Sequence, residues 1–535
     1  DNPDVLIAMN PAALKVNLKE LSLNAVIIAN QDAFNDRNLD LAGFDSNPLE
    51  DDSLKGFQLF SIPITTLTRR ALEGAGLTQK EMDRCKNFFA LGMMYWMYTR
   101  PLDPTNRWIE EKFKRRPELV EANQKALTAG YNFADTTEVF TVHYEVQHAK
   151  IEPGLYRNLS GNEALSMGLI AAGEKSGLKL FLGSYPITPA SDILHELSKH
   201  KNFGVKTFQS EDEIAAINAA IGASFAGLIG VTTTSGPGMA LKTEAIGLAV
   251  ITELPLVIIN VQRGGPSTGL PTKTEQADLL QAVYGRNGEA PVPVIAAQSS
   301  SDCFNAAFEA VEIALKFMTP VLLLSDGYIA NGAEPWRIPN VDDLKNIEVH
   351  FTKDAEKFAP YSRNKDTLAR MWAIPGTPGL EHRIGGLEKE DGSGNISYDS
   401  DNHDHMIRLR ADKVQRIANF VEDPQIYGEA SGDILVVSWG STYGTVQAVI
   451  EKLHAEGKKV SNYHLRWINP LPKSLKNYID KFKYVLVPEI NMGQLVKIIR
   501  SEYLVDAKGY NVVRGLPLRV KDLKNAINDI LKGLE

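Results

Sequence analysis

Three consecutive acidic residues carry the strongest chemical signal in this sequence. Glu211, Asp212 and Glu213 follow a short run rich in β-branched and apolar residues and precede a stretch of small residues, Ile214 to Ala226. Helix capping is the ordinary explanation, because the helix dipole favours negative charge in the first turn. The Ala, Ile, Gly and Asn composition of the helix, however, predicts that it is buried nearly all round. At least one acid would then be desolvated, and a buried carboxylate has a raised pKa and can donate or share a proton.

Arg263 gives a second signal. It ends an apolar run and is followed by Gly264, Gly265 and Pro266 and then by two hydroxyl residues. A guanidinium group binds a carboxylate through a pair of parallel hydrogen bonds, so this position suits a carboxylate ligand. Pairing with a local acid explains the arginine equally well, and the residues alone leave both interpretations open.

Both signals belong to a set of loops that each follow a short apolar run. Amphipathic stretches separate the runs, and this alternation of strand, loop and helix predicts an α/β protein with a doubly wound parallel sheet. Ligands bind such sheets outside the carboxyl ends of the strands. We therefore expect one active face, built from Tyr185–Pro189, Gln209–Glu213, Thr234–Gly238 and Gln262–Gly269.

Other motifs of nucleotide chemistry are absent from the sequence. The turn Ser235–Gly238 lets the backbone approach a ligand closely, although many strand–helix turns use glycine. No GxGxxG follows a strand and no GxxxxGK[ST] occurs, so neither dinucleotide binding nor P-loop chemistry is indicated.

Composition excludes several classes of protein. A chain of 535 residues is expected to hold about three or four domains. With 44% hydrophobic and 23% charged residues and a net charge of -9, it resembles soluble globular proteins and gives no reason to expect nucleic acid or a membrane as partner. No apolar run reaches the ~20 residues of a membrane span, and no signal peptide opens the chain, so we expect a cytoplasmic protein.

The cysteines and histidines predict no metal centre. Cys85 and Cys303 are far apart and are expected to be buried or inert thiols, and two cysteines cannot hold an iron–sulfur cluster alone. His382, His403 and His405 stand among acids but lack ligand pairs at helical spacing, so we expect no metal on this chain.

The chain divides into parts that differ in how regularly strand and helix patterns alternate. Its first residues, Asp4–Met9, already have the pattern of a core strand, so we expect something to precede them. Residues 336–425 are rich in Pro, Gly, Asp and Asn and form a connecting arm, which we expect to lack elements of its own and to cross a neighbour or form an interface. The strand–helix order resumes after residue 426.

Several of these motifs together resemble one family. Glu213, Ala216, Ala219 and Ala223 are similar to the Glu-x-x-Ala helix of the pyrimidine-binding domain in thiamine diphosphate enzymes. The four loops occur in the same order as in 2-oxoacid:ferredoxin oxidoreductases, most like the 2-oxoglutarate members with fused γ and α parts. The further motifs that share this order are Gly161–Ala164, Gly264–Leu279 and Pro488–Leu495.

The resemblance implies a domain organisation. Residues 1–150 would be a partial α/β γ-like domain without its glycine-rich beginning, and 151–335 the thiamine diphosphate pyrimidine-binding domain. Residues 336–425 would be the arm, and 426–535 a transketolase C-terminal-like α/β domain.

The resemblance also implies roles for site residues. Glu213 would bond N1′ of the aminopyrimidine, with Glu211 as the rival for this role, while Thr188 would bond the 2-oxoacid and Arg263 its carboxylate. Tyr185, Pro186, Glu213 and Ser235 would line the cofactor site. The second carboxylate of 2-oxoglutarate would be met by Lys242, Lys273 or Arg286, or by a partner chain.

What the chain lacks implies a partner. It has no Gly-Asp-Gly motif followed by the asparagine pair that holds Mg²⁺ and diphosphate in thiamine enzymes, and no cysteines for a cluster. The family resemblance thus implies a β subunit that shares the thiamine diphosphate and carries Mg²⁺ and a [4Fe–4S] cluster, in a heterodimer or a dimer of heterodimers. Coenzyme A would be the co-substrate and ferredoxin the electron acceptor, with flux in either direction.

Three alternatives remain open. The preferred 2-oxoacid could be pyruvate or another acid instead of 2-oxoglutarate. The chain could also belong to a non-redox thiamine diphosphate enzyme, whose partner would carry no cluster. A purely structural or binding subunit would tolerate loss of the Glu213 carboxylate.

Overall fold

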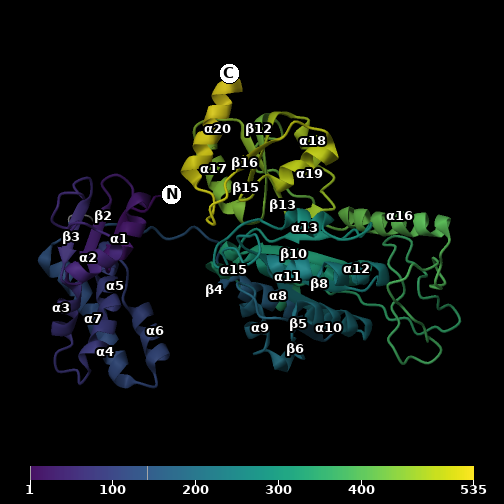
Figure 1. Cartoon of the computed structure of the whole chain (residues 1–535), viewed down its shortest axis with the longest axis horizontal. Helices are drawn as coiled ribbons and strands as arrows, with labels where there is room; N and C mark the ends of the chain where they lie inside the picture. The colour runs from purple at the N-terminus through teal and green to yellow at the C-terminus, as the bar shows by residue number, and fades with distance from the viewer. Residues whose placement is uncertain (1, 141–142, 535) are drawn as a thin grey trace. The chain divides into compact units, whose positions relative to one another are not determined.

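The computed structural model describes residues 2–140 and 143–534. They form two compact units, Asp1–Glu152 and Pro153–Glu535, and each is described here by itself. Figure 1 labels the elements of both units.

The smaller unit combines a parallel three-stranded sheet with helices. Its strands pair in the order β1-β2-β3, and α5 packs along α7. This packing is close because a Cβ on Gly92 would lie 2.0 Å from the Leu127 carbonyl oxygen and one on Gly130 would lie 1.9 Å from that of Phe89. The elements are β1 (Val5–Ala8), β2 (Val26–Asn30), β3 (Gln58–Ile62), α1 (Pro11–Asn17), α2 (Asp36–Ala42), α3 (Ile64–Ala71), α4 (Gln79–Arg84), α5 (Lys86–Met97), α6 (Asp103–Phe113) and α7 (Pro117–Thr137).

The larger unit is built on a seven-stranded sheet with the order β14-β9-β10-β8-β7-β5-β6. All pairings are parallel except that of the edge strand β14, which is antiparallel to β9 and comes from the carboxyl-terminal part of the chain. The doubly wound sheet is therefore confirmed, with one antiparallel edge. The strands are β5 (Leu180–Ser184), β6 (Lys206–Gln209), β7 (Ile229–Thr234), β8 (Leu256–Gln262), β9 (Val294–Ala296), β10 (Pro320–Asp326) and β14 (Trp467–Asn469).

Helices cover both faces of this sheet. In the central strand β8, Val257 and Ile259 belong to the core beneath one set of helices, whereas Leu256 and Ile258 belong to the core on the other face. Side chains alternate between the faces of a strand, so a strand buried on both sides reads as a continuous apolar run. Helices α8 (Gly161–Ser176), α9 (Ser191–Leu197) and α14 (Asp302–Phe317) share the first core, and α10 (Glu213–Phe225), α11 (Gly236–Leu241), α12 (Thr243–Thr252) and α13 (Leu279–Tyr284) share the second.

A second parallel sheet, with the order β13-β12-β15-β16, forms the carboxyl-terminal part of the same unit. One hydrophobic core runs through both sheets, because Leu279 of α13 and Leu435 of β12 belong to the same buried cluster. The elements are β12 (Gly432–Trp439), β13 (Val460–Leu465), β15 (Phe482–Glu489), β16 (Lys508–Asn511), α17 (Tyr443–Ala455), α18 (Leu475–Ile479), α19 (Gln494–Tyr503) and α20 (Val520–Leu534).

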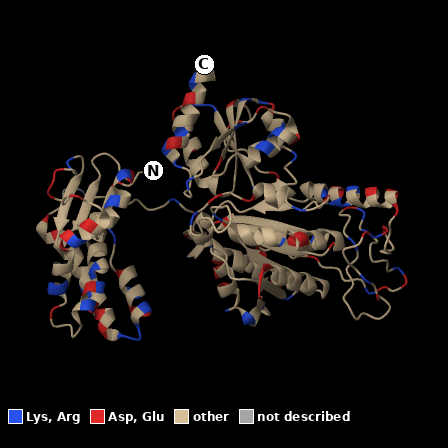
Figure 2. Cartoon of the chain, in the orientation of Figure 1, with Lys and Arg blue, Asp and Glu red and all other residues tan. Residues whose placement is uncertain are grey.

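The connecting arm differs from its prediction in one respect. It contains the helix α16 (Ser400–Arg416), although its irregular composition predicts no element of its own. Asp399 caps this helix by accepting a hydrogen bond from the backbone N–H of Asn402 at 2.7 Å. Charged residues recur along this helix, as Figure 2 shows, and dilute the apolar period that would have predicted it. A short antiparallel pair, β4 (Tyr156–Ser160) with β11 (Ala333–Arg337), precedes the arm beside α15 (Gly327–Asn331).

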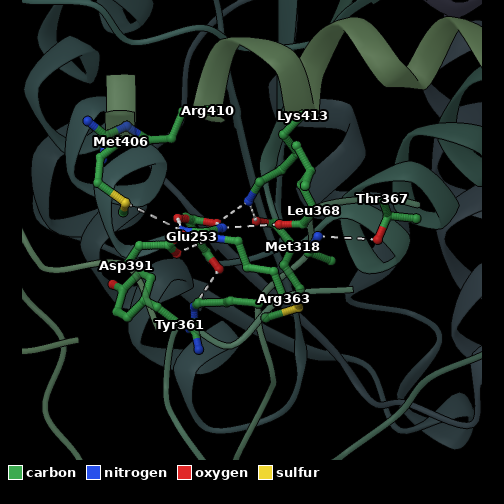
Figure 3. A network of polar contacts seen from close by, with 12 residues as sticks. Glu253, Met318, Tyr361, Arg363, Thr367, Leu368, Asp391, Met406, Arg410 and Lys413 are labelled. Carbon is green, nitrogen blue, oxygen red and sulfur yellow. Dashed lines mark hydrogen bonds and ion pairs between the residues drawn. The ribbon is translucent and has the colours of Figure 1, made fainter. Parts of the chain in front are cut away.

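A buried network of charges fixes the arm to the larger unit (Figure 3). The carboxylate of Glu253, which follows α12, is paired with Arg363 of the arm at 2.7 Å and with Lys413 of α16. Arg363 also pairs with Asp391 at 2.8 Å. These cations hold the pKa of Glu253 at about 2 despite its burial. The arm thus docks on its own chain through charges that are paired inside the protein.

The cysteines and two of the histidines have partners or burial that the structure defines. Cys85 and Cys303 are buried and free, and burial raises the pKa of both thiols. His403 and His405 lie on α16 and contact Glu388 at 3.0 Å and Asp391 at 2.9 Å, respectively. Among the described residues, no helix combines the length and the hydropathy required to cross a bilayer.

Candidate active site

The four predicted loops follow four adjacent strands. In the sheet, Ser184 at the end of β5 is in register with Gln209 of β6 and with Thr233 of β7, while Thr234 is in register with Asn260 of β8. The strands are parallel, so all four loops leave the sheet at the same edge. The prediction that the four loops meet at one edge of the sheet is therefore confirmed.

Burial separates the three acids of the second loop. Asp212 is exposed and caps α10, because its side chain accepts the N–H of Ala215 at 2.7 Å. Glu213 is the first residue of the helix and only 9% exposed, whereas Glu211 is exposed. The helix itself is not buried all round, since Ile214 is 48% exposed. The prediction that this helix is buried on all sides is therefore wrong. Composition alone does not show whether an apolar helix face is covered by the same chain or is left exposed to solvent.

A glycine turn lies directly against the Glu213 side chain. A Cβ on Gly238 would lie 2.8 Å from Cγ of Glu213 and 2.1 Å from Oγ1 of Thr234. No other residue fits at this position without moving the carboxylate or the end of β7. In the described part of the chain the Glu213 carboxylate makes no hydrogen bond, so it remains available to a ligand.

A buried lysine holds the backbone of the same residue. The side chain of Lys242 is fully buried at the junction of α11 and α12, and its Nζ donates to the Glu213 carbonyl oxygen at 2.7 Å. Burial lowers the pKa of Lys242 to about 8, against the pull of nearby Glu213 and Asp212. This contact fixes the first turn of α10 and therefore the direction in which Glu213 leaves the helix.

Arg263 links the first loop to the fourth. Its Nη1 donates to the backbone oxygen of Thr188 at 2.7 Å, at the cis Thr188–Pro189 bond. The guanidinium is 6% exposed, its Nε has no partner, and no carboxylate pairs with it among the described residues. The local ion pair considered as the alternative is thus absent from this part of the chain. Tyr185, Pro186 and Thr188 itself are exposed.

Several buried polar atoms at this edge have no hydrogen-bond partner within residues 2–140 and 143–534. Buried polar groups in proteins are nearly always hydrogen-bonded, so exceptions that gather in one place point to a ligand or a partner. The unpartnered atoms near the strand ends are Oγ of Ser210, Oγ1 of Thr232, Oγ of Ser235, Oδ1 of Asn260 and Nε of Arg263.

Two acids at the same edge received no role from the sequence. Asp278 accepts a hydrogen bond from Asn260 Nδ2 at 3.0 Å, and burial raises its pKa. Asp326 ends β10, caps α15 and accepts a hydrogen bond from Thr274 at 2.8 Å, and burial raises its pKa as well. Asp326 follows the apolar run of β10, and this position at a strand end is the signal that could have found it.

The structure distinguishes the three cations considered for a second carboxylate. Arg286 is used by its own chain, because it donates to the carbonyl oxygens of Ala282 at 2.8 Å, Val283 at 2.6 Å and Ala290 at 2.9 Å. Lys242 is occupied at Glu213. Lys273 is exposed, and its backbone oxygen accepts from the N–H of Gly264, next to Arg263, at 3.0 Å.

The fold and this site define a class, that of α/β enzyme subunits with a thiamine diphosphate-binding domain. A family model described as "Pyruvate flavodoxin/ferredoxin oxidoreductase, thiamine diP-bdg" matches residues 175–399. Two others, "Pyruvate ferredoxin/flavodoxin oxidoreductase" and "Pyruvate:ferredoxin oxidoreductase core domain II", match residues 1–133 and 432–524. The chain belongs to the 2-oxoacid:ferredoxin oxidoreductase family, as a KorA-type subunit.

Individual relatives support this membership. The 2-oxoglutarate oxidoreductase subunit KorA of Mycobacterium tuberculosis is 53% identical over 535 residues, which are 100% of this chain and 82% of that protein. The 2-oxoglutarate synthase subunit KorA of Archaeoglobus fulgidus is 34% identical over 68% of this chain and 96% of its own length. A solved 2-oxoglutarate:ferredoxin oxidoreductase from Magnetococcus marinus, with 2-oxoglutarate, coenzyme A and succinyl-CoA bound, is 30% identical with a TM-score of 0.88, covering 99% of this chain and 88% of the other.

Proposed function

We propose that this chain is the subunit of a 2-oxoglutarate:ferredoxin oxidoreductase that binds the aminopyrimidine of thiamine diphosphate and the 2-oxoacid. The enzyme would convert 2-oxoglutarate and coenzyme A to succinyl-CoA and CO₂, with ferredoxin as electron acceptor. The proposal rests on two observations at one sheet edge. The Glu213 carboxylate is buried and makes no hydrogen bond among the described residues, and Nε of the Arg263 guanidinium has no partner among them either. The relatives named above make 2-oxoglutarate the first choice of substrate.

The residues present fit the pyrimidine half of the cofactor. Glu213 would share a proton with N1′ of the aminopyrimidine through a hydrogen bond, and the missing side chain at Gly238 leaves room for the carboxylate. Ser235, whose buried Oγ has no partner, would donate to or accept from the same ligand, and Tyr185 and Pro186 would line its edge. When bound, thiamine diphosphate supplies the carbanion chemistry that decarboxylation of a 2-oxoacid requires.

Substrate recognition is assigned to the first and fourth loops. Arg263 would bind the carboxylate next to the keto group through its fork of N–H groups. Thr188, whose backbone already holds Arg263, would bond the same end of the substrate through its exposed side chain. For the second carboxylate, Lys273 is the one of the three predicted cations that remains exposed, and the partner subunit could supply it instead.

The β subunit is assigned to the open side of this edge. Large apolar side chains are exposed around the loops, including Tyr185 (38%), Ile214 (48%) and Leu241 (53%). Exposed apolar patches rimmed by polar residues mark protein–protein interaction sites. We infer that the partner covers this edge and brings the diphosphate site, Mg²⁺ and the [4Fe–4S] cluster, in a heterodimer or a dimer of heterodimers.

We also propose a role for each part of the chain. Residues 151–335 would hold the cofactor and substrate, and 1–150 would correspond to the γ-like part. The arm, 336–425, and the transketolase C-terminal-like domain, 426–535, would support them.

The proposal is tested with the complex of this chain and its β subunit. Reduction of ferredoxin should require both coenzyme A and a 2-oxoacid, with a higher kcat/KM for 2-oxoglutarate than for pyruvate, and the complex should absorb visible light as iron–sulfur proteins do. A preference for pyruvate would favour the broader group of 2-oxoacid:ferredoxin oxidoreductases, to which a 28%-identical relative from Aeropyrum pernix belongs. Turnover without a cluster would instead indicate a non-redox thiamine enzyme.

A further inference from the structure

Gln276 connects the substrate loop to the carboxyl-terminal domain. It lies between Arg263 and α13 and is fully buried. Its Nε2 donates to the backbone oxygen of Trp439, at the end of β12, at 2.8 Å, and its Oε1 accepts the N–H of Ile490, just after β15, at 3.1 Å. Both ends of the amide are thus satisfied by the backbone of a different domain.

The backbone of Gln276 is bound by the same segment. Its N–H donates to the Ile490 oxygen at 3.3 Å, and its carbonyl accepts from Asn491 Nδ2 at 2.9 Å. A glycine permits this close approach: a Cβ on Gly440, which has a φ of +57°, would lie 2.8 Å from Gln276 Nε2. All four polar groups of Gln276 therefore contact the carboxyl-terminal domain.

A second amide repeats this arrangement from the opposite direction. Gln494, at the start of α19, donates to the backbone oxygen of Ala277 at 2.7 Å and accepts the N–H of Leu280 at 2.9 Å. Two motifs that are more than 200 residues apart in the chain, Gly264–Leu279 and Pro488–Leu495, are thereby joined by reciprocal glutamine contacts.

Short connections lead from Gln276 to Arg263. Two residues beyond Gln276, the N–H of Asp278 donates to Oε1 of Gln262 at 3.1 Å, and Gln262 is the neighbour of Arg263. On the other side of the loop, the N–H of Gly264 donates to Lys273 at 3.0 Å. Movement at Gln276 therefore reaches both residues that flank the guanidinium.

We propose that Gln276 is a positioning residue that couples the carboxyl-terminal domain to Arg263, so that this domain sets the affinity for the 2-oxoacid without contacting it. The inference rests on the proposed role of Arg263 in binding the substrate carboxylate. A glutamine suits the position because one amide offers both a donor and an acceptor. A displacement of about 1 Å in a positioning group can cost roughly 100-fold in an enzyme reaction.

The test is Gln276→Glu in the complex with the β subunit. The introduced carboxylate faces the Trp439 oxygen, so the donor is lost, while its protonated form restores one donor and one acceptor. We expect KM for 2-oxoglutarate to rise about 10- to 100-fold with kcat changed less than about threefold, and the rise to shrink as the pH is lowered toward the pKa of the introduced group. An unchanged KM, or a rise independent of pH, would overturn the proposal.

Asn469→Ala is the matched control. Asn469 Nδ2 donates to the Val292 oxygen at 2.7 Å, so this contact also joins the carboxyl-terminal domain to the larger sheet, but not to the substrate loop. It should leave KM within about twofold of wild type; an equal rise would mean that general loosening of the domain contact is responsible. If Gln276→Glu fails to assemble, Gln494→Ala is measured instead and should raise KM by a smaller factor.

A double-mutant cycle separates this inference from the proposed function. If Gln276 acts through Arg263, Gln276→Glu should add less than about threefold to KM in an Arg263→Lys background, because coupled residues are not additive. A full, independent effect would overturn the coupling. An Arg263→Lys complex whose own KM is unchanged would overturn the role of Arg263, which is a different result.

Discussion

Around Glu253, buried charges lie against partners of opposite sign from the same chain, whereas several buried polar atoms at the ends of β7 and β8 have no partner among the residues that the structure describes. Both regions lie in the larger unit. Glu253 is 1% exposed and Ser235 is fully buried, so burial alone does not distinguish them. The difference lies in the groups that face them: two cations of the same chain meet the Glu253 carboxylate, although Nη2 of neighbouring Arg370 is unpartnered, whereas Oγ of Ser235 has no partner among the described residues.

This difference separates structure from function. A buried ion pair is costly to form, and breaking it by removing one partner leaves a charge without compensation. Such a network therefore fixes an arrangement, here that of the arm. A polar atom that is buried and unpartnered costs stability, and an ordered water, a bound ion or a ligand is what completes such an atom. The comparison predicts that changes near Glu253 act on stability and that changes at the sheet edge act on turnover.

The largest effect is expected from Glu213→Gln. The carboxylate makes no hydrogen bond within the described residues, so its loss should leave the thermal unfolding midpoint of the chain nearly unchanged. Turnover of the complex should fall by about 10²- to 10⁴-fold, the range typical of lost acid–base assistance. Steady-state assays of kcat with saturating thiamine diphosphate measure this.

Glu211→Gln is the control for that variant. Glu211 is exposed and two residues away, so its replacement should leave kcat close to wild type. If Glu211→Gln abolished turnover and Glu213→Gln did not, the assignment would be reversed. Unchanged turnover in both would indicate a structural subunit.

Glu253→Gln should have the opposite signature. Arg363 and Lys413 would remain buried without their carboxylate, and the free energy of unfolding should fall by about 3–5 kcal/mol. Urea unfolding of the full chain measures the change, and kcat per folded complex should be preserved. Asp404→Asn, which breaks the exposed pair of Asp404 with Arg408, should leave the unfolding midpoint unchanged. A stable Glu253→Gln variant would show that the arm docks without this network.

The sequence predicted the site edge better than it predicted the arm. The four loops follow from a local rule, because each apolar run ends where its own loop begins and parallel strands share an edge. Glu213, Thr188 and Arg263 could therefore be placed on one face, and family resemblance proposed their roles. The pairing of Glu253 with Arg363 could not be predicted, since it joins residues 110 positions apart through irregular backbone.

Surface exposure also escaped prediction, for a physical reason. The residues of α10 are small and apolar on all sides, as expected of a buried helix, yet Ile214 is exposed in this chain. A helix face that is buried by a partner chain has the same apolar composition as a face that is buried within its own chain. Likewise, the sequence pattern does not predict α16, because this helix has no broad apolar face. It is stabilised by its cap and by buried contacts of Met406 and Val414.

The smallest effect on function is expected from Ser235→Ala, and this variant is compared with Ser184→Ala, because the two serines lie at the ends of neighbouring strands. Ser235 follows β7 and its buried Oγ has no partner, whereas Ser184 ends β5 and its Oγ bonds Oγ1 of Thr233 at 2.7 Å. Removing an unpaired hydroxyl costs little, so Ser235→Ala should change the free energy of unfolding of the full chain by less than about 0.5 kcal/mol, or raise it. Ser184→Ala leaves Thr233 unpaired and should cost about 1–3 kcal/mol.

The two variants should have the opposite order in their effect on binding of thiamine diphosphate. If the Ser235 hydroxyl is completed by thiamine diphosphate, Ser235→Ala should weaken cofactor binding to the complex about 2- to 10-fold, as expected of one hydrogen bond. Ser184, already paired inside the sheet, should affect cofactor affinity little. Isothermal titration of the cofactor into the complex, beside urea unfolding of the full chain, gives both quantities for both variants. Equal stability losses in the two serine variants would contradict the distinction, because the Ser235 hydroxyl would then have a partner within the chain.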